Sequence, residues 1–509
     1  MPRTFKNLLA NLLGSGSSAL IGLLSIPLII HFVGAEAYGL IGFYATLQGI
    51  FQLLDLGFSP TMSREMARYS VQPEKKQEAR DLVRTLEIVY WMLALVIGLG
   101  TVIASPFLAR NWLQSQTIPE TVILQSLVIM GILSAVQWPI TFYQGGLIGL
   151  QHQVALQTGK GIFSALRNLG GVGILAFFSP TILAFFVWQV VVGIMQVVWL
   201  MWLLWHVMPK SVDLGRPKFR AALLRQVGNF AMGMSGITLF GLLLTQMDKV
   251  ILSRFLPLEI FGYYILASNL SSFLRLAADP IFNVAFPQFS ALVAQNDFLS
   301  LRRKYQLIAQ LIAVLIIPAA GALVFFAKPI LTIWTRNAVI AESTTPILVL
   351  LTFGTALNCL MLPAYSLKLA SGYTRVAFAI TATLAVVLVP VILIMTLNFG
   401  AIGAASVWAF LNLSYVLIGI PITHHFALKG EAIPWFKSAL IIPLSCTLIV
   451  FLASLGGLSL VAPFLSNPYI YLGSIIVVWA IAFLLCVLAM PLTRELVVNQ
   501  KRRLASVLS

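Results

Sequence analysis

Ionisable side chains within apolar stretches are the residues of this sequence best suited to chemistry. Arg275 and Asp279 are spaced i, i+4, which places them on one face of a helix and within reach of each other. A charge in membrane hydrocarbon costs at least ~2.5–3.5 kcal/mol, so it normally faces a partner or a watery cavity. One hypothesis is an ion pair that only stabilises a helix bundle. The other is a cavity in which Arg275 binds an anionic substrate group and the acid exchanges a coupling ion.

Five further charged residues lie within or at the ends of apolar stretches: Asp248, Lys249, Arg167, Asp55 and Arg64. Sorted by charge, the candidates form two predicted sets. The substrate-binding set comprises Arg275, Lys249, Arg167 and Arg64, and the ion-coupling set comprises Asp248, Asp279 and Asp55. For Asp55 and Arg64, ordinary helix-end charges are the simpler interpretation.

Signatures of enzymes and of metal sites are missing from the sequence. No glycine-rich segment has the spacing and lysine of a phosphate-binding P-loop, so export driven by ATP hydrolysis on this chain is not expected. The adjacent His424 and His425 have no third ligand at suitable spacing. All three cysteines fall within apolar stretches, where a free thiol is an ordinary small core residue. We expect no enzymatic activity, cofactor or metal.

The elements that must position these charges are membrane helices. The chain is 59% hydrophobic and 9% charged, and about 20 apolar residues suffice for a helix to span a bilayer. The alternation typical of a membrane barrel is missing. We predict an all-α polytopic membrane protein with about fourteen spans, at residues 7–32, 38–58, 86–106, 121–149, 161–179, 182–205, 229–252, 259–282, 306–327, 345–367, 377–397, 402–423, 438–458 and 469–490.

The net charge of +16 is distributed as a topology signal. With the N-terminus inside, 25 of the 32 Lys and Arg residues fall on the cytoplasmic side and four fall in outer loops. Because basic residues favour the cytoplasmic side, both termini and residues 64–84 are predicted to be cytoplasmic. The basic charge therefore indicates orientation and contact with anionic lipid, and no nucleic-acid partner is expected.

An internal repeat organises the spans into two halves. A step of 223 residues relates Tyr38-Gly39 to Phe261-Gly262, and likewise Gln52 to Arg275, Pro106 to Pro329 and Gly149 to Gly372. Each copy contains six spans, so both copies insert with the same orientation, related by a pseudo-two-fold axis along the membrane normal. The predicted domains are an N-terminal lobe (1–206), a cytoplasmic linker (207–227), a C-terminal lobe (228–426), and a hairpin of spans thirteen and fourteen with a cytoplasmic tail (427–509).

Two segments carry a resemblance to a known family. Residues 34–68, GAEAYGLIGFYATLQGIFQLLDLGFSPTMSREMAR, resemble the start of Wzx-type polysaccharide flippases, in the polysaccharide transporter branch of the MOP superfamily. Residues 246–270, QMDKVILSRFLPLEIFGYYILASNL, are similar to the opening of their second lobe. By position, Asp248 and Arg275 match charged second-lobe residues that matter in this family.

The resemblance implies a flippase that moves an undecaprenyl-pyrophosphate-linked oligosaccharide, such as an O-antigen unit of lipopolysaccharide, from the inner to the outer leaflet of the cell inner membrane. It implies alternating access driven by an ion gradient, and a polysaccharide polymerase as a possible partner. Three alternatives stay open: a lipid II flippase, a multidrug exporter of the same superfamily, and a non-transporting scaffold of a polysaccharide-synthesis complex.

Overall fold

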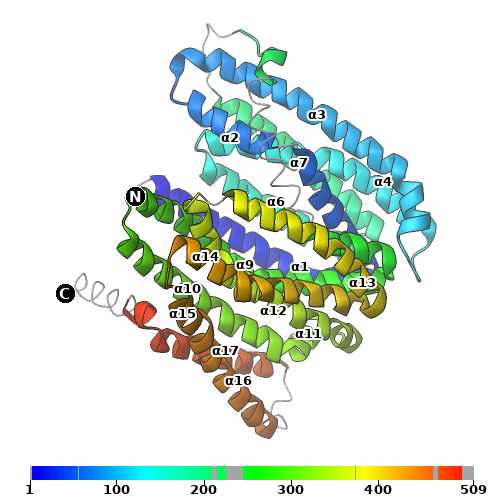
Figure 1. Ribbon diagram of the computed structural model, residues 1–509. Coiled ribbons are helices and arrows are strands. Elements are labelled where there is room, and N and C mark those ends of the chain that lie inside the picture. Colours follow the sequence, from blue (N-terminus) through cyan, green and yellow to red (C-terminus); the bar gives the residue numbers. More distant parts are fainter. Residues whose placement is uncertain are drawn as a thin grey trace, which may run out of the picture. The chain divides into compact units, whose positions relative to one another are not determined.

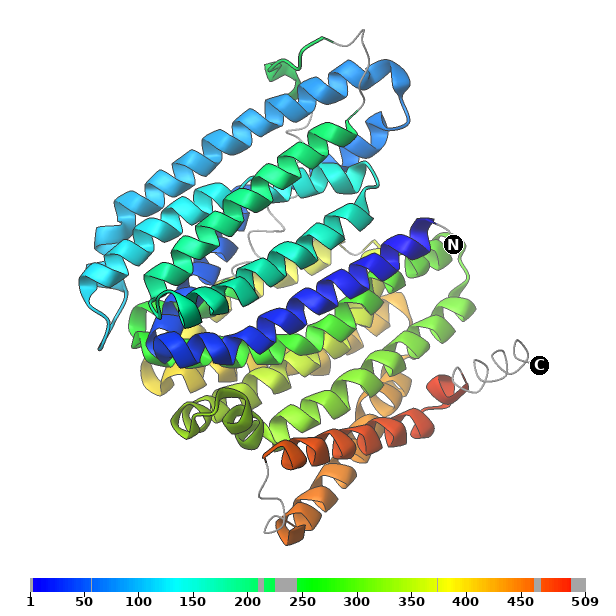
Figure 2. The ribbon, with the colours of Figure 1, turned by 180° about the vertical axis from the view of Figure 1, so that it is seen from behind.

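The computed structural model describes residues 3–55, 57–208, 215–224, 245–372, 374–461 and 468–495, and this part of the chain is helical (Figures 1 and 2). Among these residues there is no strand, and the single β contact is an isolated bridge between Gln114 and Pro257. The predicted all-α class is confirmed.

The elements fall into two series. Up to the linker they are α1 (Arg3–Phe51), η1 (Gln52–Asp55), α2 (Phe58–Tyr69), η2 (Pro73–Lys75), α3 (Lys76–Phe107), η3 (Leu108–Trp112), α4 (Glu120–Gln137), α5 (Ile140–Gly149), α6 (Gln153–Phe177) and α7 (Ile182–Val207). After it, a helical segment at 245–255 precedes α9 (Leu258–Ala294), α10 (Phe298–Phe325), α11 (Ala327–Thr335), α12 (Ala338–Ala370), α13 (Thr374–Ser414), η4 (Tyr415–Gly419), α14 (Ile420–Ala427), α15 (Ala432–Trp435), η5 (Phe436–Ile441), α16 (Ile442–Val461) and α17 (Pro468–Ala489).

Ten helical stretches of the described chain are long and apolar enough to cross a membrane. They expose large apolar side chains, for example Ile103 at 78% and Phe410 at 68% exposure, as lipid-facing surfaces do. The protein is therefore a multi-pass membrane protein. The count of fourteen spans stays a prediction, because most of the seventh predicted span lies outside the described residues.

Two glycines divide helices that each cover two predicted spans. In α1, Gly34 has φ of 82° and lies between predicted spans 7–32 and 38–58. In α13, Gly400 has φ of 60° and separates 377–397 from 402–423. Because L-residues rarely adopt positive φ, glycine lets the chain turn between two helical spans almost without a loop.

Two compact units make up the chain, residues 1–262 with 384–389, and residues 263–383 with 390–509. The core of the first unit contains buried side chains of α2 to α7, such as Met62, Tyr90 and Phe142. The core of the second contains side chains of α9, α10, α12 and the segments that follow, such as Phe289, Tyr305 and Trp435. The predicted domain boundaries stay a prediction.

Small residues let α2 lie directly on α5. A Cβ atom at Gly145 would be 2.6 Å from the Ser59 carbonyl oxygen, and one at Gly149 would be 2.4 Å from that of Ser63. Glycines four residues apart expose one strip of backbone, which is how membrane helices approach closely. This contact fixes α2 beside Thr141, whose carbonyl accepts a 2.9 Å hydrogen bond from the Ser59 hydroxyl.

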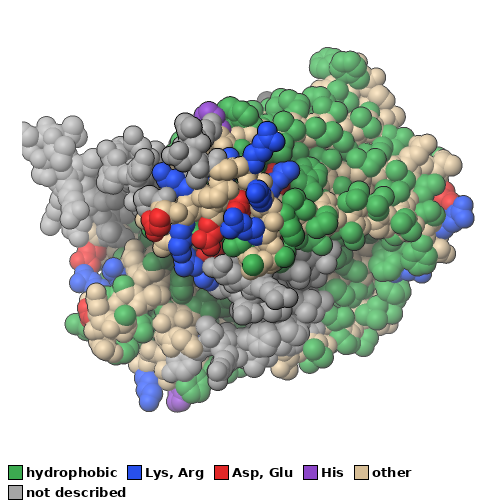
Figure 3. Space-filling model, turned by 90° about the horizontal axis from the view of Figure 1, so that it is seen from above, with side chains coloured by type: hydrophobic (Ala, Val, Ile, Leu, Met, Phe, Trp, Pro, Cys, Tyr) green, Lys and Arg blue, Asp and Glu red, His purple; other side chains and the backbone are tan. Residues whose placement is uncertain are grey.

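The described part of the linker, residues 215–224, is attached to the start of α3. The buried Asp81 carboxylate pairs with Arg220 Nε at 2.8 Å and accepts the Lys218 backbone N–H at 2.9 Å. The Arg220 N–H also donates to the Thr85 hydroxyl at 2.9 Å. Figure 3 shows a face of the molecule on which Lys and Arg side chains gather among acidic ones, beside a broad hydrophobic area.

Candidate functional site

A polar pocket of about 330 Å³ lies within the first unit. Five helices contribute to it: α1, α4, α5, α6 and α7. Its lining consists of Gln48, Gln137, Ile140, Thr141, Lys160, Ser164, Arg167 and Gln196. Seven of these eight side chains are polar, which is unusual between helices whose outer faces are apolar, and the pocket is therefore the main candidate site.

Three of the pocket residues share one face of α6. Lys160, Ser164 and Arg167 are separated by four and three residues, the spacing that aligns side chains along a helix. The helix begins at Gln153. The span predicted at 161–179 is therefore part of a longer helix, and Lys160 lies two turns inside that helix.

Arg167 is held by α7. Its Nη2 donates to Gln196 Oε1 at 2.7 Å, and its backbone carbonyl accepts from Gln189 Nε2 at 3.1 Å. Both glutamines are buried, so these bonds fix the direction of the guanidinium. Among the described residues, no carboxylate lies within ion-pair distance of Arg167 or Lys160, so the pocket carries two cations without an acid beside them.

The amides of the pocket are partly engaged and partly available. Gln48 Nε2 donates to the Tyr44 hydroxyl at 2.8 Å and to Ser134 Oγ at 3.1 Å. Gln137 Nε2 is buried and has no hydrogen-bond partner within the described chain. Since a buried donor without a partner is costly, such a group in a pocket wall is suited to a ligand acceptor.

The predicted pair in the second half forms as its spacing indicates. Arg275 Nη2 lies 3.4 Å from Asp279 Oδ1, both on α9. Arg275 Nη1 also donates to Asn358 Oδ1 at 3.2 Å, and Asn358 Nδ2 donates to Asn412 Oδ1 at 2.8 Å. The side chains of Arg275 and Asp279 nevertheless stay 42% and 48% exposed, so both can still meet a ligand.

Asp248 and Lys249 pair with each other. Lys249 Nζ lies 3.6 Å from Asp248 Oδ1 and donates to the Thr245 carbonyl at 3.0 Å. Both side chains are 19% exposed. These contacts are local to the segment at 245–255.

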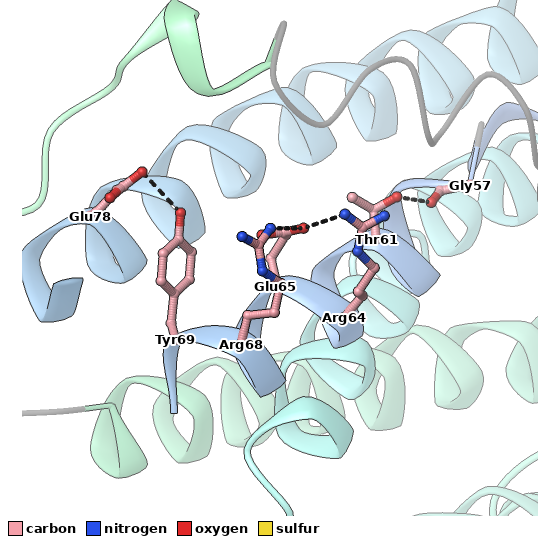
Figure 4. A network of polar contacts seen from close by, with 7 residues as sticks. All are labelled: Gly57, Thr61, Arg64, Glu65, Arg68, Tyr69 and Glu78. Atoms are coloured by element: carbon pink, nitrogen blue, oxygen red, sulfur yellow. Dashed lines mark hydrogen bonds and ion pairs between the residues drawn. The ribbon is translucent and has the colours of Figure 1, made fainter. Parts of the chain in front are cut away.

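Asp55 and Arg64 each take part in hydrogen bonds or ion pairs that involve α2. The Asp55 carboxylate accepts the Tyr90 hydroxyl and, at 3.3 Å, the backbone N–H of Ser59 in the first turn of α2. Arg64 pairs with the buried Glu65 at 3.3 Å, and Arg68 pairs with the same carboxylate at 3.0 Å (Figure 4). Asp55 lies just before α2, in accord with a helix-end charge, whereas Arg64 lies in the middle of α2 with its side chain 47% exposed.

The same helix ends in a buried phenol. The Tyr69 hydroxyl donates to Glu78 Oε1 at 3.1 Å (Figure 4). Burial raises the pKa of Tyr69, and the negative charge of Glu78 raises it further. Tyr69 therefore remains a neutral donor that ties α2 to α3.

The sequence predicts Arg167 as a site residue but none of the other residues of the pocket. The predicted spans leave Lys160 in a cytoplasmic loop, and the glutamines have no charge that marks them in an apolar stretch. The spacing of Lys160, Ser164 and Arg167 is the signal that could have found the site.

The arrangement of long apolar helices is the fold of solved membrane transporters, including members of the MOP superfamily. The structure is similar to the lipid II flippase MurJ in its inward closed conformation, with a TM-score of 0.70 and 13% identity over 93% of this chain and 97% of that chain. An inward-facing MATE family multidrug resistance transporter matches with a TM-score of 0.64 and 15% identity, over 81% and 96%. A MOP superfamily transporter from Pyrococcus furiosus, described as having a binding pocket of reverse polarity, matches with a TM-score of 0.54 and 14% identity, over 83% and 95%.

The family itself follows from the sequence comparison. Residues 4–293 match the model of the polysaccharide biosynthesis protein family, and the chain belongs to that family. No curated protein matches the chain. The predicted resemblance to a polysaccharide family is thereby confirmed, and the solved structures of MOP superfamily transporters share its fold.

Proposed function

We propose that the protein is a flippase that moves a polyprenyl-pyrophosphate-linked oligosaccharide, the repeat unit of a polysaccharide, from the inner to the outer leaflet. The observation that carries this proposal is the pocket of the first unit, where Lys160 and Arg167 have no carboxylate beside them within the described chain. A pyrophosphate supplies the anion that such a site lacks. The family match to polysaccharide biosynthesis supports the same substrate class.

The chemistry of the pocket fits the two polar parts of this substrate. A guanidinium binds phosphate through two parallel hydrogen bonds, while a lysine ammonium acts as a mobile point charge. Amides and hydroxyls, here those of Gln48, Gln137 and Thr141, both donate and accept, as sugar hydroxyls require. The prenyl tail needs no polar site, because it can remain in lipid during transport.

A multidrug exporter is the second candidate, because of the fold match. A site for organic cations needs an exposed acid or an aromatic cage. The pocket has neither among its lining residues, and its two positive charges repel a cation. The polarity of the pocket therefore favours the anionic lipid-linked substrate.

The second half would contribute Arg275 to the substrate and Asp279 to ion exchange, because both are half exposed. Asp248 and Lys249 form a less exposed pair that we assign to coupling and to substrate contact, respectively. Arg64 and Asp55 keep supporting roles around α2. The protein would act in the cell inner membrane with both termini in the cytoplasm, and a polysaccharide polymerase is a candidate partner for its product.

The test is flipping in reconstituted vesicles. A fluorescent polyprenyl-pyrophosphate-linked oligosaccharide is placed in both leaflets, and the fraction that becomes accessible to a membrane-impermeant quencher is followed. Each charge-assisted hydrogen bond lost in Arg167→Ala costs about 1.5–3 kcal/mol, which lowers the flipping rate about 10- to 100-fold. Lys160→Ala gives a similar loss.

Lys304→Ala is the matched control. Lys304 is exposed and donates to Gln288 at 3.2 Å, outside the pocket. This variant retains the original rate. Equal rates in the control and in the Lys160 and Arg167 variants, all folded, would refute the proposal, and transport of organic cations would favour the exporter. Flipping by the unmodified protein in vesicles would also exclude the alternative of a non-transporting scaffold.

A further inference from the structure

A chain of side-chain hydrogen bonds runs from Arg275 into the interior of the second compact unit. Arg275 Nη1 donates to Asn358 Oδ1 at 3.2 Å, and Asn358 Nδ2 donates to Asn412 Oδ1 at 2.8 Å. Asn412 Nδ2 donates in turn to the Trp408 carbonyl at 2.8 Å, one helical turn earlier in α13. Asn412 is 1% exposed and the Arg275 side chain is 42% exposed, so the chain joins a buried end to an accessible one.

The buried end of this chain is fixed by packing between α12 and α13. The Trp408 ring lies against Gly354, where a Cβ atom would be 2.6 Å from Trp408 Cδ1. Trp408 Nε1 also donates to the Thr355 hydroxyl at 3.2 Å. Because a backbone carbonyl only accepts, the Asn412 atom that faces the Trp408 carbonyl must be the nitrogen, and the Asn412 oxygen points away from it.

The orientation of Asn412 determines that of Asn358. Since the Asn412 oxygen only accepts, Asn358 turns its nitrogen toward Asn412 and its oxygen toward Arg275. In the opposite orientation, the Asn358 nitrogen would direct its donors at a guanidinium that has no acceptor. Asn412 therefore acts on Arg275 through Asn358, by ensuring that the guanidinium meets an acceptor.

Arg275 keeps donors for a ligand after these contacts are made. A guanidinium has five N–H groups, and here one is given to Asn358 and one is directed at Asp279 at 3.4 Å, which leaves three among the contacts of the described residues. The two contacts use different nitrogens, so together they fix the plane of the guanidinium. A phosphate takes two parallel N–H groups, and a fixed plane presents them without further loss of side-chain freedom.

We propose that Asn412, acting through Asn358, is a positioning residue that directs the free N–H groups of Arg275 toward the pyrophosphate of the lipid-linked oligosaccharide. The inference rests on the proposed function and adds a residue that determines how well the second half binds the anionic group. Asn412 is uncharged and buried, so this role needs no contact between Asn412 and the substrate.

Combination with Arg275→Ala tests whether Asn412 acts through Arg275. In Asn412→Leu, Asn358 loses the acceptor that orients it, and flipping at a low mole fraction of substrate falls about 2- to 10-fold, the effect of one neutral hydrogen bond. Asn358→Leu gives at least the same loss. In an Arg275→Ala background, Asn412→Leu causes no further loss, because the group through which it acts is gone. The same fall in that background would overturn the proposal.

Gln310→Leu is the matched control for the removal of a buried amide. Gln310 is 3% exposed, and its Oε1 accepts the Leu492 N–H at 3.2 Å, outside the chain that leads to Arg275. This variant keeps flipping within about twofold of the original rate, which is below the loss expected for one hydrogen bond of the site. If Asn412→Leu does not fold, Asn412→Ser gives the same comparison, because a serine hydroxyl is too short to reach Asn358.

Protection of Arg275 by inorganic pyrophosphate gives a readout that needs no transport. Phenylglyoxal modifies accessible guanidinium groups, and peptide mass spectrometry measures its rate at Arg275 in the full-length protein in detergent. Pyrophosphate slows this modification, and Asn412→Leu needs about 2- to 10-fold more pyrophosphate for the same protection. Equal protection in the two proteins would overturn the positioning role. Lack of protection in the original protein would remove Arg275 from the substrate site and the proposal with it, whereas the expected protection without flipping would count against the proposed function alone.

Discussion

Replacing Arg275 by alanine tests whether this residue binds substrate or only forms a stabilising ion pair with Asp279. The ion pair with Asp279 spans 3.4 Å between groups that are 42% and 48% exposed. A pair so accessible to water contributes about 0–1 kcal/mol to stability. If the only role of Arg275 were this ion pair, Arg275→Ala would lower the melting temperature of the protein by a few degrees at most. Transport would change little.

A substrate role predicts a much larger effect on rate. A guanidinium that holds phosphate through two charge-assisted hydrogen bonds contributes at least about 1.5–3 kcal/mol, so its loss slows flipping about 10- to 100-fold or more. Arg275→Lys keeps the charge and loses the planar fork, and it retains partial activity. The assay is the vesicle flipping rate, with the melting temperature in detergent as the measure of folding.

The double variant decides between the two roles. In Arg275→Ala with Asp279→Ala, the unpaired acid is removed together with its partner. A substrate-binding Arg275 leaves the double variant as slow as the single one. Restoration of flipping by the second substitution would show that Arg275 only neutralises Asp279, and the substrate-binding role would have to be abandoned.

Three further predictions concern packing, the linker and topology. Gly149→Ala forces a Cβ to 2.4 Å from a backbone carbonyl of α2 and destabilises the protein by about 1–3 kcal/mol, seen as a lower melting temperature that the open-space control Gly173→Ala lacks. Asp81→Asn breaks the 2.8 Å pair with Arg220, so limited proteolysis should cut residues 215–224 faster; unchanged cutting would argue against the attachment. A reporter fused after Ser70 should report the cytoplasm, and an outer location would reverse the predicted orientation.

The predictions that the structure supports in detail depend on the spacing of residues that are close together in the sequence. Arg275 and Asp279 can be paired from sequence because four residues on one helix fix their separation. The repeat is read from the sequence alone and stays a prediction. The positive-φ glycines of α1 and α13 occur where two predicted spans meet almost without a loop.

Contacts between distant helices cannot be predicted in this way. Arg167 meets Gln196 across 29 residues, and Asp55 meets Tyr90 across 35. Which faces of two helices meet depends on packing, which hydrophobic pattern alone leaves open. Lys160 escapes prediction because a lysine at the edge of an apolar stretch reads as the end of a span, whereas α6 begins at Gln153, two turns earlier.

The unpaired cations of the pocket have a consequence for energetics. In a flippase of the proposed kind, the empty pocket carries the charges of Lys160 and Arg167, and a bound pyrophosphate neutralises them. A membrane potential acts with about 2.3 kcal/mol per elementary charge per 100 mV over the full bilayer. Voltage would therefore act mainly on the empty protein. An electrically negative cell interior would favour the return of the unloaded pocket toward the cytoplasm. The potential would therefore accelerate this return step, and it would have little effect on the step in which the pocket carries substrate.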